Sequence, residues 1–313
     1  MATSDSSWEL VLGRLSAREL CRVAPTSSVF ADVVRKLHRQ REEDVSRGLE
    51  DMKIPHVGRT GGERYAEGFT YTRASVMVDG TSIEVTEADY ATLDCSCSKC
   101  EIDKCPCLSG CFIQNGRLTT RHGAHMRECG EKCGCRGSCP SRVVQKGVSQ
   151  AMFLKKVPGK GWGVFAGDLI SAGQFVCEYA GEVLTTEEAR RRQMIYDRRE
   201  MNYLLVIREV LPSRQTCFRV NIDPTHVGNV GRFFNHSCDG GNLEVFLVRV
   251  GGCPMPRAAF FAKADIAPGT ELTFSYGGDG DYSAPVVEGE NASRRECTCG
   301  ASSCKGVLPS EVT

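Results

Sequence analysis

The chain has 313 residues, and its 39 basic and 39 acidic side chains give a formal net charge of zero at neutral pH. Because the charges balance, the whole chain has no strong electrostatic field that would attract a nucleic acid or a membrane. Any electrostatic attraction of a partner must come from local charged patches. The first residues lack a basic segment followed by an apolar stretch, so a secretory signal is not expected. No run approaches the roughly 18 apolar residues that a membrane span requires, and no membrane partner is expected.

The first section of the chain is predicted to be helical. Apolar side chains recur at helical spacing over residues 8–23 and 28–41, which indicates two amphipathic helices. A glycine-containing linker follows at residues 59–62. We interpret this section as an extension that packs on the rest of the molecule.

Short strands dominate the remainder of the chain. Runs rich in valine, phenylalanine and tyrosine predict strands within residues 69–85 and at residues 152–157, 163–165, 175–179, 202–207, 218–222, 243–250, 258–262 and 271–274. One helix is predicted over residues 185–200, since threonines can cap its start, acidic residues open it and arginines follow. Frequent turns with one prominent helix indicate a mostly β, α+β domain.

Cysteine usage is the strongest signal in the composition. Ten of the 18 cysteines fall between Cys95 and Cys139, and three more fall between Cys297 and Cys304. A secreted disulfide framework is the alternative, but such scaffolds are short and cysteine-dense throughout. Clustered cysteines in a long chain without a signal peptide favour metal thiolates in a reducing compartment.

The first cysteine cluster has the spacing C-x-C-x2-C-x4-C-x-C followed by C-x3-C-x-C-x3-C. Nine thiols suit three tetrahedral zinc ions, which need twelve bonds, if six thiolates are terminal and three bridge. The predicted ligands are Cys95, Cys97, Cys100, Cys105, Cys107, Cys129, Cys133, Cys135 and Cys139. With every position filled by protein, this zinc would fold the segment and do no chemistry. Cys111 is a spare thiol, either free or able to replace a neighbouring ligand.

The second cluster, Cys297, Cys299 and Cys304, is one thiol short of a structural zinc site. The fourth ligand must come from elsewhere in the chain, and the candidates are Cys177, Cys217, Cys238 and Cys253. Cys238 follows the polar run Asn235-His236-Ser237. If Cys238 is the ligand, folding of the C-terminal tail is tied to that polar run.

Five motifs in order give the chain a family resemblance. They are the nine-cysteine series, GKGWG at residues 159–163, EYAGE at 178–182, RFFNHSC at 232–238, and ELTFSYG at 271–277 with the closing C-x-C-x4-C. Over residues 69–308 the chain resembles the SET-domain protein lysine methyltransferases of the Su(var) class, and is most similar to their plant members. The resemblance implies a mostly β SET fold with one prominent helix, preceded by a tri-zinc cysteine cluster and followed by a zinc-binding tail.

The same resemblance implies four segments along the chain. They are an N-terminal helical extension at residues 1–64, a pre-SET zinc-cluster domain at 65–146, a SET catalytic domain at 147–281 and a post-SET zinc-binding tail at 282–313. It also implies three zinc ions in the pre-SET segment and one in the post-SET segment.

The resemblance also assigns a binding site for S-adenosylmethionine. The residues at the family's donor-binding positions are Lys160, Gly161, Trp162, Tyr203, Arg232, Asn235 and His236. Glycines let the backbone approach a ligand closely, and tryptophan supplies an aromatic wall. Without the family context, the glycine-rich turn, the Asn-His pair and Tyr203 would each pass as an ordinary turn or strand residue.

Tyr276 matches the family's catalytic tyrosine, and Tyr203 lines both the donor and the lysine channel in the family. Phe274 stands where the family has phenylalanine or tyrosine. Since phenylalanine lacks a hydroxyl that would hold a water and crowd bulky products, di- or trimethylation is expected. The alternative is that Phe274 is simply an inward residue of a strand.

The expected substrate is a histone tail, by resemblance the H3 tail at its ninth-residue lysine, or another basic peptide. No lysine or arginine occurs between Lys263 and Arg294, whereas six acidic residues do, which would suit a guide for such a peptide. Chromatin is the expected partner and the nucleus the expected location, with no sequence-specific nucleic-acid binding. The alternative function is a non-catalytic, zinc-containing chromatin-binding module.

Overall fold

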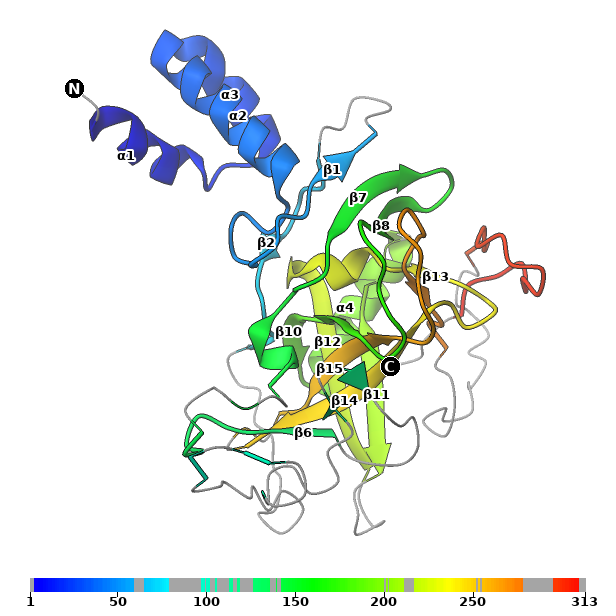
Figure 1. The fold of residues 1–313 in the computed structure, drawn as a ribbon. Helices are drawn as coiled ribbons and strands as arrows, with labels where there is room; N and C mark the ends of the chain where they lie inside the picture. The colour runs from blue at the N-terminus through cyan, green and yellow to red at the C-terminus, as the bar shows by residue number, and fades with distance from the viewer. Residues whose placement is uncertain are drawn as a thin grey trace.

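The structure is a computed structural model, and it describes most of the chain outside the cysteine-rich segment. The described residues are 3–58, 65–78, 97–98, 100–101, 105, 113–114, 117–118, 126–135, 139, 142–199, 201, 203–210, 217–251, 253, 255–277 and 295–309. The predicted linker at residues 59–62 lies outside them. Helices gather at the N-terminal end, and short sheets form the body (Figure 1). Within the described part, no helix is both long and apolar enough to cross a bilayer.

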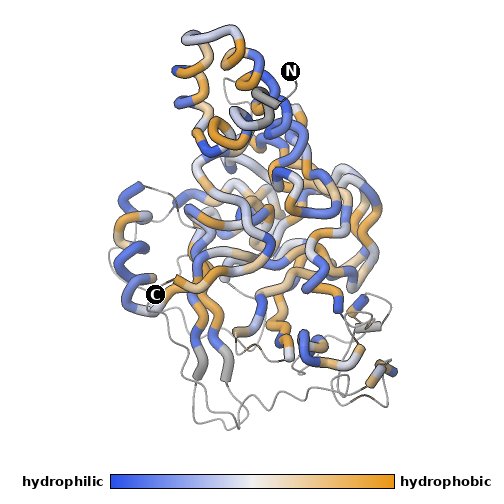
Figure 2. The backbone as a smooth tube through the Cα atoms, turned by 90° about the vertical axis from the view of Figure 1, so that its left-hand side faces the viewer, coloured by the Kyte–Doolittle hydropathy of each residue, from blue (hydrophilic) through white to orange (hydrophobic). Residues whose placement is uncertain are grey.

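The N-terminal section forms three helices where the sequence predicted two. They are α1 (Thr3–Leu12), α2 (Ala17–Val23) and α3 (Ser28–Glu43), with a short 3-10 turn, η1 (Ala24–Thr26), before α3. The prediction of one helix over residues 8–23 is wrong, because Ser16 and Glu19 form a capping box that starts α2 afresh. Apolar side chains meet between the helices, including Leu20 and Leu37. Figure 2 shows hydrophobic and hydrophilic residues alternating along these helices.

The body consists of small sheets, as the mostly β prediction required. The first has the order β1 (His56–Val57), β7 (Met152–Val157), β8 (Gly161–Ala166). The second has the order β11 (Leu205–Val210), β12 (Cys217–Gly228), β10 (Gly181–Leu184), β3 (Val76–Met77), and β2 (Thr70–Tyr71) also pairs with β12. The third has the order β6 (Met126–Glu128), β14 (Leu243–Val250), β15 (Arg257–Ala262), β9 (Phe175–Glu178). Two pairs complete the set: β13 (Asn235–His236) with β16 (Thr273–Phe274), and β4 (Ile113–Gln114) with β5 (Arg117–Leu118).

Most predicted strands are present with shifted ends. The strand at residues 152–157 is confirmed, and so is the one at 243–250. The segment predicted as 218–222 is part of the longer β12, and the last predicted strand shortens to β16. Two 3-10 turns, η3 (Val144–Lys146) and η4 (Val230–Phe233), connect the sheets.

A core of aromatic rings joins the sheets beneath the cleft that carries the predicted site. Phe260 on β15 is fully buried, and its ring meets Phe234 and Phe274 edge-on, with centroids 5.1 and 4.8 Å away. Burying a phenylalanine stabilises the fold by about 1.5–3 kcal/mol. These contacts fix the positions of β13 and β16, which carry Asn235, His236 and Phe274.

The predicted helix of the SET segment is α4 (Thr186–Arg198), and Thr185 caps it by accepting the backbone N–H of Glu188. The helix is attached to β12 by charge. Arg192 donates to Asp223 at 2.8 Å, and the Tyr196 hydroxyl donates to the same carboxylate at 2.8 Å. Burial alone would raise the pKa of Asp223, but hydrogen bonds from Thr225, Arg192 and Tyr196 outweigh it and hold the pKa below its usual range.

We expect Asp223→Asn to lower the free energy of unfolding by about 2–3 kcal/mol, since a fully buried, charge-assisted acceptor is lost. Because the native pKa of Asp223 is depressed, its stabilisation is present above the unfolded pKa of about 3.9 and is lost as pH falls further. Glu188→Gln is the matched control: it contacts the same guanidinium from a half-exposed position and should cost less than about 1 kcal/mol. Denaturant unfolding at neutral and acidic pH measures both, and equal losses would contradict the assignment.

Candidate active site and metal centres

One group of thiols lies at the end of the molecule opposite the N-terminal helices. The sulfur atoms of Cys100, Cys129, Cys135 and Cys139 all lie within 4.8 Å of one another, with Cys129 at 3.7 Å from Cys100 and 3.6 Å from Cys139. Zinc–sulfur bonds of about 2.3 Å place tetrahedral ligands about 3.8 Å apart, far beyond a disulfide length of about 2.05 Å. The donor set therefore fits zinc.

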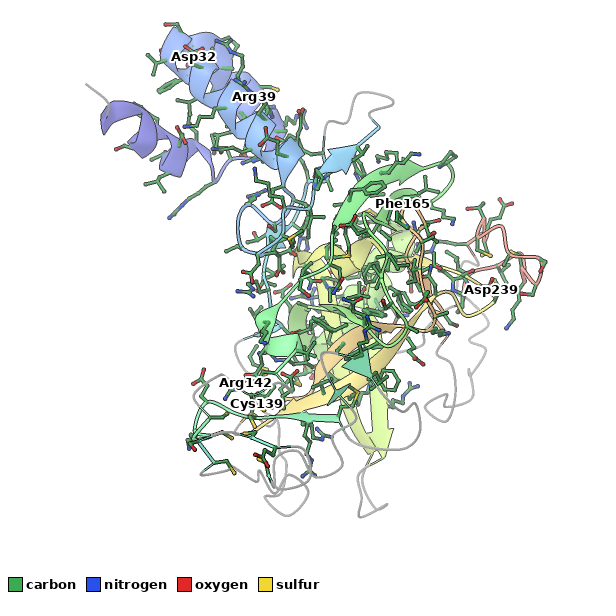
Figure 3. The ribbon with its side chains drawn as sticks, viewed as in Figure 1. Asp32, Arg39, Cys139, Arg142, Phe165 and Asp239 are labelled. Carbon is green, nitrogen blue, oxygen red and sulfur yellow. The ribbon has the colours of Figure 1, made fainter. Side chains whose placement is uncertain are left out.

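The surroundings of this thiol group are also suited to thiolates. Arg142 donates to the sulfur of Cys135 at 3.8 Å, and Figure 3 shows Arg142 beside Cys139. Burial lowers the pKa of Arg142, but Cys135 and its neighbours outweigh that effect and the pKa rises. Three more predicted ligands, Cys97, Cys105 and Cys133, pack in the same cluster. The predicted ligands Cys95 and Cys107, and the spare Cys111, lie outside the described residues.

A second group of thiols shows which cysteine lies beside the three cysteines of the tail. The sulfur atoms of Cys238, Cys297, Cys299 and Cys304 lie within 4.8 Å of one another, and Cys238 is 3.7 Å from Cys297. Of the other candidates, Cys177 is buried in the core and Cys253 is exposed. The side chain of Cys217 lies outside the described part of the structure.

Backbone amides of the tail also donate to these sulfurs. The N–H of Lys305 lies 3.4 Å from the sulfur of Cys238, and that of Gly306 lies 3.5 Å from Cys304. Such donors favour thiolates, so this set of ligands also fits zinc. Residues 295–309 are thereby attached beside β13.

We expect Cys238→Ala to reduce bound zinc by about one equivalent per chain, because a structural site holds its ion with four protein ligands. Inductively coupled plasma mass spectrometry measures the metal, and limited proteolysis near residues 295–309 reports the release of the tail. Cys253→Ala is the control with an exposed thiol outside the group and should leave both readouts unchanged. A zinc content equal to that of the parent in Cys238→Ala would contradict the site.

A cleft of about 1310 Å³ lies beside the tail. Every residue predicted for donor binding or catalysis lines this cleft, except Phe274. The eight lining residues are Lys160, Gly161, Trp162, Tyr203, Arg232, Asn235, His236 and Tyr276. Phe274 is buried behind the cleft, with its ring centroid 4.9 Å from that of Tyr276. The structure therefore brings these eight residues together around one cleft.

The glycine-rich turn closes the hairpin of β7 and β8. Gly159 and Gly161 have φ values of 75° and 86°, a left-handed conformation that other residues rarely adopt. Lys160, between them, pairs with Glu271 at 2.9 Å. Asn235 donates to the other oxygen of the same carboxylate at 2.8 Å. Glu271 thus ties the turn to β13 and leaves the backbone of the turn facing the cleft.

Two of the acidic residues proposed as a guide for a basic peptide have partners within the protein. The sequence suggested that the acidic residues after Lys263 guide a basic peptide, but Glu271 is used within the wall of the cleft. Asp265 accepts the backbone N–H of Ala172 at 2.7 Å. The remaining acids, Asp279, Asp281, Glu288 and Glu290, lie outside the described residues.

His236 connects the tail to Tyr276. Its Nδ1 lies 3.1 Å from the backbone N–H of Tyr276, which donates to it. The proton of the neutral ring is then on Nε2, 3.2 Å from the sulfur of Cys238. Burial lowers the pKa of His236, which favours this neutral form. One ring thereby bonds both to a zinc-ligand candidate and to the backbone of Tyr276.

Tyr276 is held at its hydroxyl as well. The hydroxyl donates to the carbonyl oxygen of Phe234 at 2.9 Å, and the ring lies between those of His236 and Phe274. Burial raises the pKa of Tyr276 well above its usual value. The hydroxyl is therefore neutral at physiological pH.

Arg232 places a positive charge in the cleft. Its guanidinium donates to the carbonyl of Pro224 at 2.9 Å and lies over the rings of Tyr203 and Phe69, at 4.2 and 4.5 Å. Burial lowers the pKa of Arg232, but an arginine stays protonated. Among the described residues no carboxylate lies within ion-pair distance of it. This arrangement suits a ligand that brings its own carboxylate.

Sequence reasoning missed several residues of the cleft. Some come from the tail and from the strand before Arg232: Thr225, His226, Arg295, Glu296, Thr298 and Leu308. Others come from the N-terminal helices: Ala17, Cys21, Ala24, Val34 and His38. The helical periodicity predicted an apolar face on these helices, but it did not indicate which part of the protein this face would contact.

Comparisons with known proteins identify the family. Family models match the chain at residues 161–277, as the SET domain, and at residues 46–142, as the Pre-SET motif. The chain is 40% identical to the histone-lysine N-methyltransferase SUVR3 of Arabidopsis thaliana, over 97% of this chain and 91% of that protein. The chain belongs to the Su(var)3-9 family of SET-domain histone-lysine methyltransferases.

Solved structures agree with this membership. The methyltransferase domain of human SETMAR has a TM-score of 0.71 and 33% identity, covering 85% of this chain and 97% of that one. KRYPTONITE in complex with mCHH DNA, an H3(1-15) peptide and SAH has a TM-score of 0.67 and 29% identity, covering 85% of this chain and 53% of that one. As a SET enzyme, the chain depends on S-adenosylmethionine, and its cysteine groups are consistent with zinc sites.

Proposed function

We propose that this enzyme transfers methyl groups to the ninth-residue lysine of the histone H3 tail and that the reaction takes place beside Tyr276. The observation that carries the proposal is the placement of Tyr276: a half-buried residue with a neutral hydroxyl, held by hydrogen bonds at its backbone N–H and at its hydroxyl, in a cleft lined by the seven other residues assigned to the donor. The KRYPTONITE structure, which holds an H3 peptide and SAH on a similar fold, supports the choice of substrate. The proposed cellular location, on chromatin in the nucleus, follows from that substrate.

The residues proposed to bind the donor would recognise different parts of it, some by charge and others by shape. Arg232 would pair with the carboxylate of the amino-acid part of the donor. The turn at Lys160 and Gly161 would offer backbone groups, and Trp162 an aromatic surface. Asn235 and His236 would contact the donor from β13. When bound, S-adenosylmethionine supplies a methyl group on a positively charged sulfur, and the sulfur becomes a neutral thioether once the methyl group is transferred.

The lysine nucleophile must reach the donor as a neutral amine. Free lysine titrates near 10.4, so deprotonation at neutral pH costs about 4–5 kcal/mol. An apolar channel reduces this cost by disfavouring the ammonium form, and a nearby positive charge acts in the same direction. Phe274 and the ring of Tyr276 offer such apolar walls. The neutral hydroxyl of Tyr276 would orient the amine for attack, and positioning of two reactants supplies much of the rate.

The substrate peptide would bind beside the cleft. A histone tail can bind in an extended conformation, with its side chains alternating between pockets. Tyr203 lies just before β11 and also lines the cleft, which would bring the target lysine to the donor.

We also propose the remaining organisation that the family resemblance implies. The extension would span residues 1–64, the pre-SET segment 65–146, the SET domain 147–281 and the post-SET tail 282–313. Three zinc ions would occupy the pre-SET segment and one would occupy the tail. The thiol groups at Cys129 and Cys238 support a metal in each segment.

We expect Tyr276→Phe to lower kcat by about 100-fold or more, because an unoriented amine rarely lines up with the donor. A radiolabelled methyl-transfer assay on a panel of histone tails measures both the rate and the preferred tail, and an H3 tail with its ninth lysine replaced by arginine should accept no label. Tyr71→Phe removes another buried hydroxyl, bonded to Glu50 outside the cleft, and controls for loss of stability. Equal activity of Tyr276→Phe and the parent would remove Tyr276 from the mechanism.

The product state should depend on residue 274. Because Phe274 packs against Tyr276 and has no hydroxyl to hold a water, we propose that the enzyme forms di- or trimethyl-lysine. We expect Phe274→Tyr to shift the product toward monomethyl-lysine, since the added hydroxyl takes up space behind Tyr276. Mass spectrometry of an H3 peptide at increasing reaction times measures this. A parent enzyme that stops at one methyl group would refute the proposal.

A further inference from the structure

His56 lies against Trp162, although it is not among the residues that the family resemblance assigns to the donor site. Its ring meets the ring of Trp162 edge-on, with centroids 5.1 Å apart and an interplanar angle of 75°. β1 carries His56 and runs parallel to β7, whose antiparallel partner β8 carries Trp162. Lys156 lies over the same indole at 4.6 Å. Trp162 is therefore held by neighbours on its own sheet before any ligand binds.

The orientation of the His56 ring is fixed by two hydrogen bonds from separate segments. Nε2 lies 3.0 Å from the backbone N–H of Ala66, which can only donate, so Nε2 is the acceptor. The proton of the neutral ring is then on Nδ1, which donates to the carbonyl of Glu42 at 3.3 Å. The side chain is buried as well. Rotation of this ring would break both bonds.

The segments that hold His56 belong to the N-terminal helical unit and its connection. Glu42 is in the last turn of α3, and Tyr65 beside Ala66 bonds to His38 on α3 at 2.8 Å. Arg41 donates to the carbonyls of Gly13 and Leu15, at 2.9 and 2.7 Å, which ties α1 and α2 to the same helix. In Figure 1, β1 lies between these helices and the β7–β8 hairpin.

The helices also reach the cleft itself. Ala17, Val34 and His38 line the same cavity as Trp162 and Asn235. The N-terminal unit therefore lines part of the cleft and also contacts Trp162 through His56. A helical unit that only covered an apolar surface would need neither the contact with the cleft nor the contact between His56 and Trp162.

We propose that His56 is a positioning residue for the methyl donor: it sets the tilt of Trp162, and the N-terminal helices hold His56 in place for that purpose. The inference rests on the proposed donor site and extends it to a residue and a helical segment that the resemblance does not assign to the donor. Loss of the His56 ring should weaken donor binding and leave the methyl-transfer step and the peptide site intact.

The test uses the full chain with Trp8→Phe, which makes Trp162 its single tryptophan. In this background His56→Ala should raise the Kd and KM for S-adenosylmethionine by about threefold to tenfold, the range of one aromatic contact. It should leave kcat and the KM for an H3 peptide within about twofold of the background, the pattern of lost uniform binding. The emission of Trp162 should shift, with greater quenching by acrylamide. His56→Phe, which keeps a ring, should recover donor affinity to within about twofold.

Several outcomes would overturn the proposal. They are an unchanged Kd in His56→Ala, an unchanged Trp162 emission, or a His56→Phe protein that binds the donor no better than His56→Ala. If His56→Ala does not fold, as judged by zinc content and melting temperature, His56→Gln retains an acceptor for Ala66 without the ring and must show the same loss. Trp162→Ala separates the two hypotheses: if it binds the donor as tightly as the parent, the proposed donor site itself is wrong.

Discussion

The geometry of the active cleft depends on one small bridge, the imidazole of His236 between the sulfur of Cys238 and the backbone N–H of Tyr276. Cys238 belongs to the thiol group that attaches the tail, and Tyr276 is the residue nearest the proposed chemistry. Because one ring makes both bonds, its orientation cannot change without disturbing either the metal-ligand set or the tyrosine. The proposed zinc site of the tail and the proposed donor cleft are in this way parts of the same local structure.

The rest of the site is supported by the aromatic core and by charge. Phe234, Phe260 and Phe274 pack edge-on beneath the cleft, so the two short strands that carry Asn235 and Phe274 do not rely on their few hydrogen bonds alone. Glu271 joins Lys160 to Asn235 across the cleft wall. Since interiors are densely packed, these contacts restrict the residues proposed to bind the donor to a narrow range of positions. Preorganisation of this kind is what methyl transfer requires, because the rate depends on the alignment of two reactants.

Much of this architecture could be predicted from the sequence because the chemistry imposes short-range patterns. Cysteine spacing indicated two metal groups, and the motifs around Trp162, Asn235 and Tyr276 indicated a common cleft. For the fourth cysteine of the tail site, the sequence left four candidates. Cys238 lies 59 residues before Cys297, and the spacing of nearby cysteines does not identify a partner so far away in the chain. The pairing of Lys160 with Glu271, 111 residues apart, was hidden for the same reason. The break between α1 and α2 was signalled locally by Ser16 and Glu19, but hydrophobic periodicity runs across it and led to the wrong prediction.

The parallel pairing of β1 with β7 has a consequence for how this protein is made. His56 aligns with Leu154 in that pair, so the N-terminal helices and β1 leave the ribosome long before their partner strand exists. At 5–20 residues per second, the interval is roughly 5 to 20 seconds. During that time the apolar side chains that later contact the catalytic core have no surface to cover them. A nascent chain of this enzyme should therefore be a client for chaperones during this interval.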